Sequence, residues 1–543
     1  MNIRLLCKLL GILSLLIGAF MLFSLPWAWS SVGFHTNQVA DDGFEQRGFL
    51  GLLQSTVVCF SVGALLLWLG RKSKGKLFRK EAMAVVGLSW VLATLLGALP
   101  YFLSGTIRGT SVKLLGPNRP ALIAKFGIRL YDQWEESDEL STDEYNLLKL
   151  IENSGSAIGL SESELLIQAK KLHGIEDPIQ VFTSLQDKPG FDHVLIGPGE
   201  AARIAPADRA SNYRFRWVPM SLWDSLFESQ SGFSTTGATV ITHLEDPRLV
   251  PHCILFWRSS THFLGGLGII VLFVVILGHG SAGKALMRVE MPGPTNDGTL
   301  ARMQTSAWLF AAIYVGLNLL LSVILCLPPC GMSVFDAICH AFGTMATGGF
   351  STYNSSLGHF DSPAIEFIVT FFMILAGTNF TLLFFVAIGR PGKLLSDVEW
   401  RTYIALIAVV STLVVVFGMS SGDEGFGSVF NSVRYGLFQV VSIITTTGYG
   451  TNDFDNWNNF GRAALFILMF VGGCAGSTGG GMKVIRHLLF FKIIWVAIER
   501  SYRPRVVRML KVGDKPIEDQ KLQHNILVYF GLLLFCHFSI QPN

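Results

Sequence analysis

One short pattern occurs three times in this chain of 543 residues and constrains its fold more than any other feature. The copies read STTGAT at 234–239, MATGGF at 345–350 and TTTGYG at 445–450. Aligned on Gly237, Gly348 and Gly448, each copy has a threonine directly before the glycine. Each is preceded by a stretch of about a dozen residues, which is too short to cross a bilayer. The chain therefore repeats a half-span that ends in a glycine-containing loop.

The composition indicates an integral membrane protein. Half of the residues are hydrophobic and only 15% are charged, which is too apolar for ordinary soluble domains. Nine apolar runs are near the length of about 20 residues that a crossing helix requires. They lie at 9–29, 49–70, 82–103, 253–277, 304–327, 363–388, 401–419, 461–498 and 525–540. No small-residue cleavage site follows the first run, so we interpret it as a retained span and not as a signal peptide.

Basic residues predict how the spans are oriented, because cytoplasmic loops retain lysine and arginine. Basic clusters occur at 71–80, 390–393 and 500–511. Placing these clusters inside puts the N-terminus in the cytoplasm, and it puts residues 104–217 and all three glycine-containing loops on the outer side. The net charge of +3 is then a signal of topology, and we expect no nucleic-acid partner.

The sequence gives no sign of a metal site, of disulfide bonds or of a catalytic site. The eight cysteines lie mostly in apolar runs without the spacing of metal ligands, which predicts packing and not metal binding or disulfides. No nucleophile, base and oxyanion donor have a workable spacing, so we do not expect an enzyme. No covalently bound cofactor is expected either.

Each half-span lies between two full spans, so the predicted fold is an all-α polytopic membrane protein made of repeated span, pore helix and span units. Two leading spans are expected at 1–80. Three pore units follow, the first at 81–103 with 218–278, the second at 279–390 and the third, with its gating loop, at 391–500. An inserted module at 104–217 interrupts the first unit, and 501–543 is expected to be a basic cytoplasmic segment followed by the first span of a fourth unit. A fourth loop would fall roughly 100 residues after Gly448, beyond Asn543. Most of the fourth unit is therefore expected to be missing.

The inserted module at 104–217 is polar and is expected to be a small α+β domain on the outer side. One helix is predicted after the capping box of Ser161 and Glu164, and another near 142–152. Strand-like stretches surround these helices at 121–131 and 192–197.

The three loops predict an ion-selectivity filter. Backbone that leaves helical form at membrane depth is tolerated only where it lines a water-filled cavity or is buried in protein, so the loops are expected to meet at one lumen. Glycine permits unusual backbone angles and leaves the lumen free of side chains, and backbone carbonyls can then replace the water around a potassium ion. The expected ion-binding residues are Thr235, Thr236, Gly237, Ala346, Thr347, Gly348, Thr446, Thr447 and Gly448. The alternative is that each Thr-Gly pair is a helix C-cap turn.

A second signal lies inside the apolar run at 461–498, where six of ten consecutive residues are glycine. A helix does not persist through them at about 1 kcal/mol for each glycine. We expect a mobile gating loop beneath the third filter, with Lys483 holding its closed form. Its residues are Gly472, Gly473, Cys474, Ala475, Gly476, Ser477, Thr478, Gly479, Gly480 and Gly481. The alternative is a glycine-rich helix crossing.

Several charged or titratable residues within the apolar runs and the half-spans are further candidates. Arg258 is an intramembrane charge, which marks either a functional residue or an internal tie between repeats. Asp224 and Glu228 are expected either to attract cations at the outer mouth or to be solvated. Three weaker candidates fit a structural or interfacial position better than a proton relay, namely His262, His340 and Glu366.

Six ordered stretches resemble the membrane subunit of Trk-type potassium uptake systems, a family related to the Ktr and plant HKT transporters. They are SGFSTTGATVI, WRSSTHFLGGLGIIVL, VEMPGPT, GTMATGGFSTYNSS, ITTTGYGT and FVGGCAGSTGGGMKVIR. The resemblance covers about 1–103 and 218–540, and the two leading spans look like the extra pair of the Trk branch. The module at 104–217 is not a usual part of this family.

The resemblance implies a pseudo-fourfold pore with one filter segment per unit, potassium as the substrate, and a gating loop at GGCAGSTGGGMK. Glycine in each filter is similar to the potassium-preferring pattern and not to the sodium-passing variant with serine in the first filter. The resemblance further implies a homodimer in the bacterial inner membrane, bound to cytosolic regulatory subunits, so a nucleotide acts only through a partner. It leaves open whether symport with protons or with sodium drives uptake.

The leading hypothesis from the sequence is therefore potassium uptake by a Trk-type membrane subunit. The alternative is a truncated, non-conducting or regulatory membrane protein with the same fold.

Overall fold

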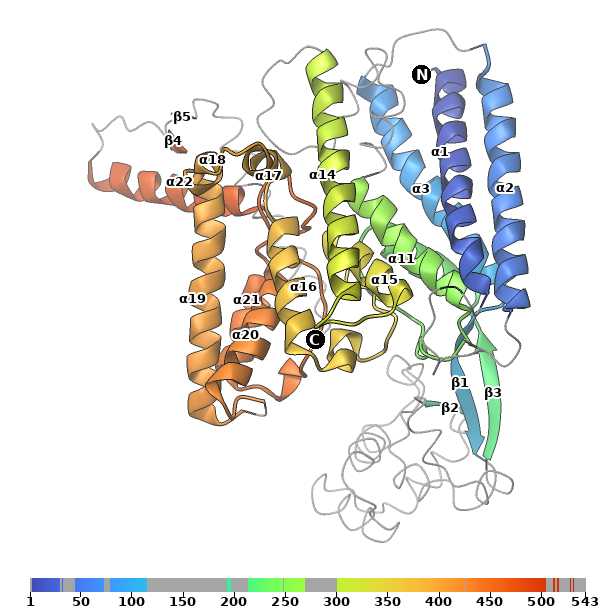
Figure 1. Cartoon of the computed structure of the whole chain (residues 1–543). Coiled ribbons are helices and arrows are strands. Elements are labelled where there is room, and N and C mark those ends of the chain that lie inside the picture. Colours follow the sequence, from blue (N-terminus) through green and yellow to red (C-terminus); the bar gives the residue numbers. More distant parts are fainter. Residues whose placement is uncertain are drawn as a thin grey trace, which may run out of the picture. The chain divides into compact units, whose positions relative to one another are not determined.

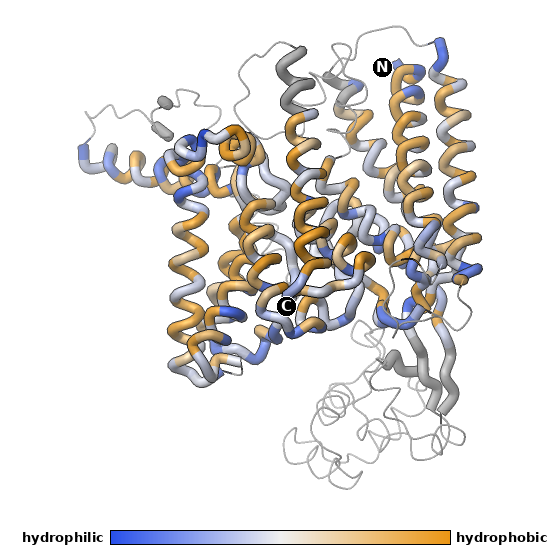
Figure 2. Tube along the Cα trace, viewed as in Figure 1, coloured by the Kyte–Doolittle hydropathy of each residue, from blue (hydrophilic) through white to orange (hydrophobic). Residues whose placement is uncertain are grey.

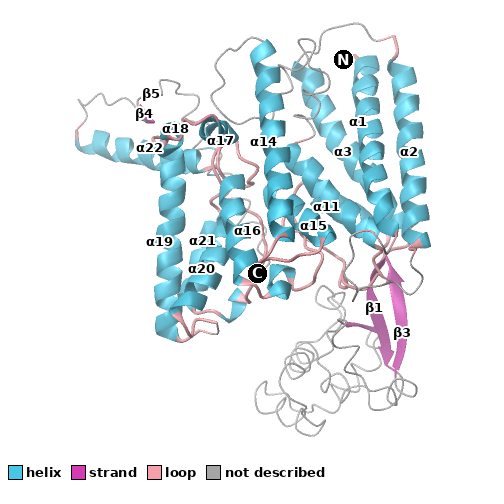
Figure 3. Ribbon diagram, viewed as in Figure 1, coloured by secondary structure: helices cyan, strands magenta, loops and turns pink. Residues whose placement is uncertain are grey.

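The computed structural model describes most of the chain outside the inserted module. The described residues are 2–29, 44–72, 79–114, 193–196, 213–247, 249–268, 300–423 and 425–503, with 32, 511, 512, 515, 516, 528 and 531. They are mainly helical, with a few strands (Figures 1 and 3). The chain divides into two compact units, which are described separately. The first comprises 1–100, 226–238 and 252–543, and the second comprises 101–225 and 239–251.

Within the described residues, five helices are long and apolar enough to cross a membrane. They are α1 (Ile3–Ser24, extended by η1 at Leu25–Ala28), α2 (Gln46–Gly70), α3 (Arg79–Leu103), α14 (Leu300–Cys326) and α19 (Val398–Ser421). Figure 2 shows hydrophobic residues along the whole length of α1, α2 and α19. In α1 and α2 the glycines Gly11 and Gly63 face each other, and a Cβ on Gly11 would lie 2.9 Å from the Gly63 carbonyl oxygen. Small residues let these two apolar helices pack closely.

The three predicted half-spans are short helices. They are α10 (Leu222–Phe233), α15 (Val334–Met345) and α20 (Val429–Ile444). A serine starts each helix by accepting a hydrogen bond from the backbone N–H three residues later, which satisfies one of the free donors at a helix N-terminus. The serines are Ser221, Ser333 and Ser428, and the oxygen to nitrogen distances are 3.1, 3.0 and 3.2 Å.

The apolar run at 363–388 is not one straight span, as the sequence predicted, but a bent pair of helices. α16 (Pro363–Ala376) and α17 (Phe380–Ala387) meet at an angle of 108°. Between them, the Asn379 side chain accepts the Thr381 N–H at 2.8 Å and so begins a new helix. The apolar composition of the run gives no sign of this turn.

The remaining spans match their predictions in part. α11 (His252–Leu267) occupies the first part of the run at 253–277, and residues 269–277 lie outside the described residues. The run at 461–498 is divided, as predicted, into α21 (Asn459–Leu468) and α22 (Val484–Tyr502). The predicted span at 525–540 lies almost entirely outside the described residues. The shorter elements are α18 (Gly392–Leu395), η3 (Ser356–Phe360), η4 (Phe454–Asn456), β4 (Lys511–Val512) and β5 (Lys515–Pro516).

The second unit contains a three-stranded antiparallel sheet. Its strands are β1 (Ile107–Leu114), β2 (His193–Ile196) and β3 (Tyr213–Pro219), and β1 lies between the other two. The predicted strand at 192–197 contains β2. The predicted strand at 121–131 and both predicted helices of the module lie outside the described residues.

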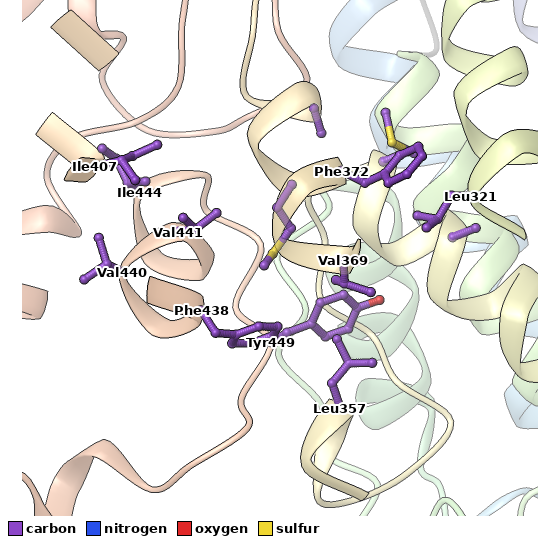
Figure 4. Close-up of a cluster of buried hydrophobic side chains, with 14 of the residues drawn as sticks. Leu321, Leu357, Val369, Phe372, Ile407, Phe438, Val440, Val441, Ile444 and Tyr449 are labelled. Atoms are coloured by element: carbon purple, nitrogen blue, oxygen red, sulfur yellow. The ribbon is translucent and has the colours of Figure 1, made fainter. Parts of the chain in front are cut away.

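The first of the two compact units has a hydrophobic core that is built by helices of the predicted second and third pore units. Leu321 of α14, Val369 and Phe372 of α16, and Phe438 of α20 are almost completely buried in it. Figure 4 shows Tyr449, which belongs to the third glycine-containing loop, among these side chains. The third loop is thus held between packed helices.

Candidate ion-binding site and gating loop

The three glycine-containing loops have the same unusual backbone conformation. In each loop a threonine and the glycine two residues later have positive φ. These pairs are Thr235 and Gly237 (53° and 78°), Thr347 and Gly349 (52° and 78°), and Thr446 and Gly448 (59° and 83°). A β-branched residue with positive φ is a genuine outlier, and such strain costs about 1–3 kcal/mol. Its occurrence three times in one pattern indicates a functional conformation.

These angles correct the predicted alignment of the second loop. The backbone N–H groups of Thr236, Gly348 and Thr447 each donate at 2.9 Å to a carbonyl near the end of the preceding helix. Gly348 is therefore equivalent to Thr236, and the residue equivalent to Gly237 and Gly448 is Gly349. The alignment on Gly348 was wrong by one residue, because two adjacent glycines leave the register ambiguous in the sequence. The sequence reasoning missed Gly349, which has the positive φ that Gly237 and Gly448 have in the other two loops.

The loops contact one another in chain order. A Cβ added to Gly237 would overlap the carbonyl oxygen of Gly348, and a Cβ added to Gly349 would overlap the carbonyl oxygen of Thr447. Only glycine permits so close an approach of two backbones. At Gly448 no heavy atom of the described residues lies within 4 Å of the corresponding position. The three loops thus form a consecutive series, from the first through the second to the third.

Threonine hydroxyls brace the loops from within. The Thr236 hydroxyl lies 2.7 Å from that of Ser234, and the Thr447 hydroxyl lies 2.8 Å from that of Thr445. In the second loop, the Thr347 hydroxyl donates to the carbonyl of Ala346 at 2.6 Å. These hydrogen bonds stabilise the strained backbone.

The predicted gating loop lies between α21 and α22 as non-helical backbone. It is bound to the turn between α16 and α17. The Cys474 N–H donates to the Gly377 carbonyl at 2.8 Å, and the Gly476 carbonyl accepts the Phe380 N–H at 3.0 Å. The loop therefore joins the second and third pore units.

The gating loop also contacts the third filter loop. The Gly480 N–H donates to the Thr446 hydroxyl at 2.6 Å. The Lys483 ammonium donates to the Gly479 carbonyl, so this side chain binds the loop by a hydrogen bond to the backbone. The predicted gating loop thus contacts the third glycine-containing loop at Thr446.

Glu399, near the start of α19, binds both the predicted gating loop and the start of α22 that follows it. Its Oε1 atom accepts the N–H of Ala475 at 2.8 Å and that of Ile485 at 3.1 Å. The sequence reasoning missed Glu399. A carboxylate in the first turn of a helix is common there for electrostatic reasons alone, so it gave no separate signal.

Arg258 is an internal tie between repeats. It is 1% exposed, and its Nε donates to Glu228 at 2.6 Å while its guanidinium also donates to the Ser351 carbonyl at 3.0 Å. The guanidinium lies 3.5 Å from the centre of the Phe350 ring. α10 and α11 are thereby joined to the backbone that follows the second filter loop.

Glu228 is completely buried against Arg258, so both predictions for it, as an attractor of cations or as a solvated residue, were wrong. Asp224 has a capping role. Its carboxylate accepts the N–H and the hydroxyl of Ser221 at 2.9 and 2.8 Å and lies 3.4 Å from Arg108. A carboxylate in these positions stabilises the start of a helix.

Glu366 forms a second buried tie between units. Arg434 of α20 donates to its two carboxylate oxygens at 2.7 and 2.6 Å and to Asp361 at 2.7 Å. The sequence reasoning missed Arg434, although its charge within a half-span is the signal that marked Arg258. These contacts support the structural interpretation of Glu366.

The two histidines differ in their hydrogen bonding. His340 is satisfied, because its ring nitrogens lie 2.8 Å from the Asp336 carbonyl and 2.9 Å from the Ser351 hydroxyl. His262 is buried, and its ring nitrogens have no hydrogen-bond partner among the described residues. It stacks on the Phe350 ring at 4.0 Å. His262 thus packs against the second glycine-containing loop, and His340 contacts the residue that follows this loop.

Comparison with known proteins identifies the family. The family model described as TrkH, cation transport protein, matches residues 207–542, which is more than half of the chain. The chain belongs to the TrkH family of cation transport proteins. It is accordingly a multi-pass membrane protein of a transport family and not of an enzyme family. The extra module at 104–217 precedes almost all of the matched residues.

Individual members of the TrkH family are similar over part of their length. The chain is 40% identical over 310 residues to the Trk system potassium uptake protein TrkH of Escherichia coli K12, covering 56% of this chain and 62% of that protein. It is 35% identical over 321 residues to the Trk system potassium uptake protein TrkG of the same organism, covering 58% and 64%. The chain thus spans about three fifths of the length of these curated relatives.

The fold is similar to a solved TrkH structure. The crystal structure of the potassium transporter TrkH from Vibrio parahaemolyticus superimposes with a TM-score of 0.65 at 26% sequence identity. The similarity covers 98% of this chain and 83% of the other.

Proposed function

We propose that this chain takes up potassium ions across the bacterial inner membrane as the membrane subunit of a Trk-type system. The observation that carries the proposal is the consecutive contact of three strained, glycine-containing loops at the ends of three half-span helices. The names of the relatives in Escherichia coli, which are potassium uptake proteins, support potassium as the ion.

In this proposal the loops bind dehydrated potassium through their backbone carbonyls. The residues involved are Thr235, Thr236, Gly237, Ala346, Thr347, Gly348, Gly349, Thr446, Thr447 and Gly448. Hydroxyl hydrogen bonds and the buried ties of Arg258 and Arg434 hold the carbonyls in place. The partial negative charge at the C-terminal ends of α10, α15 and α20 favours a cation.

The loop at 472–481 acts as the gate in this proposal. Its hydrogen bonds to Glu399, Gly377 and Thr446 correspond to a closed form. Opening the pathway requires these hydrogen bonds to break.

The assembly and topology follow the same reasoning. We place the N-terminus and the basic segments in the cytoplasm and residues 104–217 on the outer side. The chain forms a homodimer and binds cytosolic regulatory subunits, which carry any nucleotide that controls the gate.

The test is potassium-dependent growth of a bacterial strain that lacks its own potassium uptake systems. The 543-residue chain is expected to restore growth at low potassium. Gly349→Ala, which places a Cβ against the Thr447 carbonyl, is expected not to. A wild-type chain that inserts in the membrane but does not restore growth would favour the non-conducting, regulatory alternative.

A further inference from the structure

The first and third filter loops share a brace that the second lacks. In the first loop the Ser231 hydroxyl, near the end of α10, donates to the Ala238 carbonyl at 2.6 Å. In the third loop the Ser442 hydroxyl, near the end of α20, donates to the Tyr449 carbonyl at 2.7 Å. Each hydroxyl fixes the carbonyl of the residue that follows the positive-φ glycine.

The second loop has no such hydroxyl at the equivalent position. Its backbone hydrogen bonds align Gly343 with Ser231 and Ser442, and they align Phe350 with Ala238 and Tyr449. The other two bracing hydroxyls are absent as well, because the second loop has Ala346 and Gly348 where the other loops have serine or threonine.

Tyr449 of the third loop occupies the space above Gly343. Its hydroxyl is the nearest atom to the position that a Cβ on Gly343 would take, and it would overlap that Cβ. The hydroxyl lies 3.3 Å from the Phe350 carbonyl and 3.2 Å from the His340 carbonyl, and it donates to these oxygens. Tyr449 is completely buried, and Phe438 and Val369 lie beside it (Figure 4).

We propose that Tyr449 is the positioning residue of the second filter loop and that its hydroxyl replaces, from the neighbouring repeat, the serine hydroxyl of the other two loops. A buried carbonyl without its donor loses a hydrogen bond and cannot recover it from water. The Tyr449 hydroxyl can therefore reach the second loop only when residue 343 is glycine, since any side chain at 343 would displace the hydroxyl. As a statement about ion selection, the inference rests on the proposed function.

The positioning role is tested by hydrogen exchange of the full chain. In Tyr449→Phe, peptides covering residues 345–352 are expected to exchange about fivefold faster than in the wild type, which corresponds to about 1 kcal/mol. Tyr403→Phe is the matched control. That side chain is also fully buried, and its hydroxyl has no hydrogen-bond partner among the described residues. Unchanged exchange at 345–352 in Tyr449→Phe, or an equal change in Tyr403→Phe, would overturn the proposal.

A reciprocal variant tests whether the change in hydrogen exchange is specific to each loop. Ser442→Ala is expected to speed exchange in peptides covering 445–452 and to leave 345–352 unchanged, because its hydroxyl braces only the third loop. A change at 345–352 of the same size as in Tyr449→Phe would contradict a specific role for Tyr449.

The consequence for ion selection is measured separately, as rubidium and sodium uptake into cells. Tyr449→Phe is expected to raise the ratio of sodium to rubidium uptake severalfold, and Tyr403→Phe to leave it unchanged. An unchanged ratio in Tyr449→Phe would refute the role in selection. If the wild type takes up no rubidium, the proposed function fails, and the exchange measurement alone still decides the positioning role.

Discussion

Glu399 provides a sharp test of the proposed gating loop, because a single carboxylate oxygen binds both the loop and the start of the helix that follows it. Ala475 lies within the loop, and Ile485 lies just after it, at the start of α22. A hydrogen bond to a charged group contributes about 1.5–3 kcal/mol, and a neutral hydrogen bond contributes about 0.5–1.5 kcal/mol. Removing the charge therefore weakens each of the two bonds by about 1 kcal/mol.

Two substitutions at Glu399 distinguish the effect of its negative charge from the effect of losing both hydrogen bonds. Glu399→Gln keeps the accepting oxygen and is expected to favour the open loop by about 2 kcal/mol, or about 30-fold. Glu399→Ala removes both hydrogen bonds and is expected to favour it by about 4 kcal/mol, close to three orders of magnitude.

Cys474 serves as a native reporter of this opening. Its side chain is 1% exposed, so a maleimide reaches it only when the loop leaves its site. The rate of labelling, measured by peptide mass spectrometry on membranes, then follows the open fraction. Asp397→Asn is the control, because it removes a nearby negative charge from the cap of α19, where Asp397 accepts the Trp400 N–H. Labelling of Glu399→Ala at the wild-type rate would refute the assignment of Glu399.

Three further predictions concern the filter, its ties and the loop. Gly237→Ala is expected to abolish rubidium uptake, because its φ of 78° and the adjacent carbonyl exclude a side chain; normal uptake would contradict this. Arg258→Met removes the charge that pairs with the buried Glu228 and is expected to lower the free energy of unfolding by about 3–5 kcal/mol, measured by thermal denaturation in detergent. Arg258→Met with Glu228→Gln should recover most of that loss, and a double variant no more stable than the single one would be evidence against the tie. Lys483→Met is expected to speed Cys474 labelling severalfold, and slower labelling would refute its role in holding the loop.

The sequence predicted those features that depend on local physical chemistry. The half-spans follow from their length, and the break between α21 and α22 follows from the poor helix propensity of six glycines in ten residues. Both can be recognised without knowledge of any neighbouring segment.

Features that depend on tertiary contacts were predicted poorly. The turn between α16 and α17 is stabilised by hydrogen bonds from the distant loop at 472–481, so an apolar run gave no sign of it. The burial of Glu228 requires Arg258, which the sequence could not place beside it. The register of the second filter became clear only from its backbone angles, which distinguish Gly348 from Gly349.

The most direct test of the central claim is to locate the ion. Crystals of the chain grown with thallium, which substitutes for potassium, are expected to show anomalous density beside the carbonyl oxygens of Thr236, Gly348 and Thr447. Density at these oxygens that disappears in sodium would support a potassium filter made by the three loops. Thallium bound elsewhere in the membrane region, with none at the loops, would contradict the account.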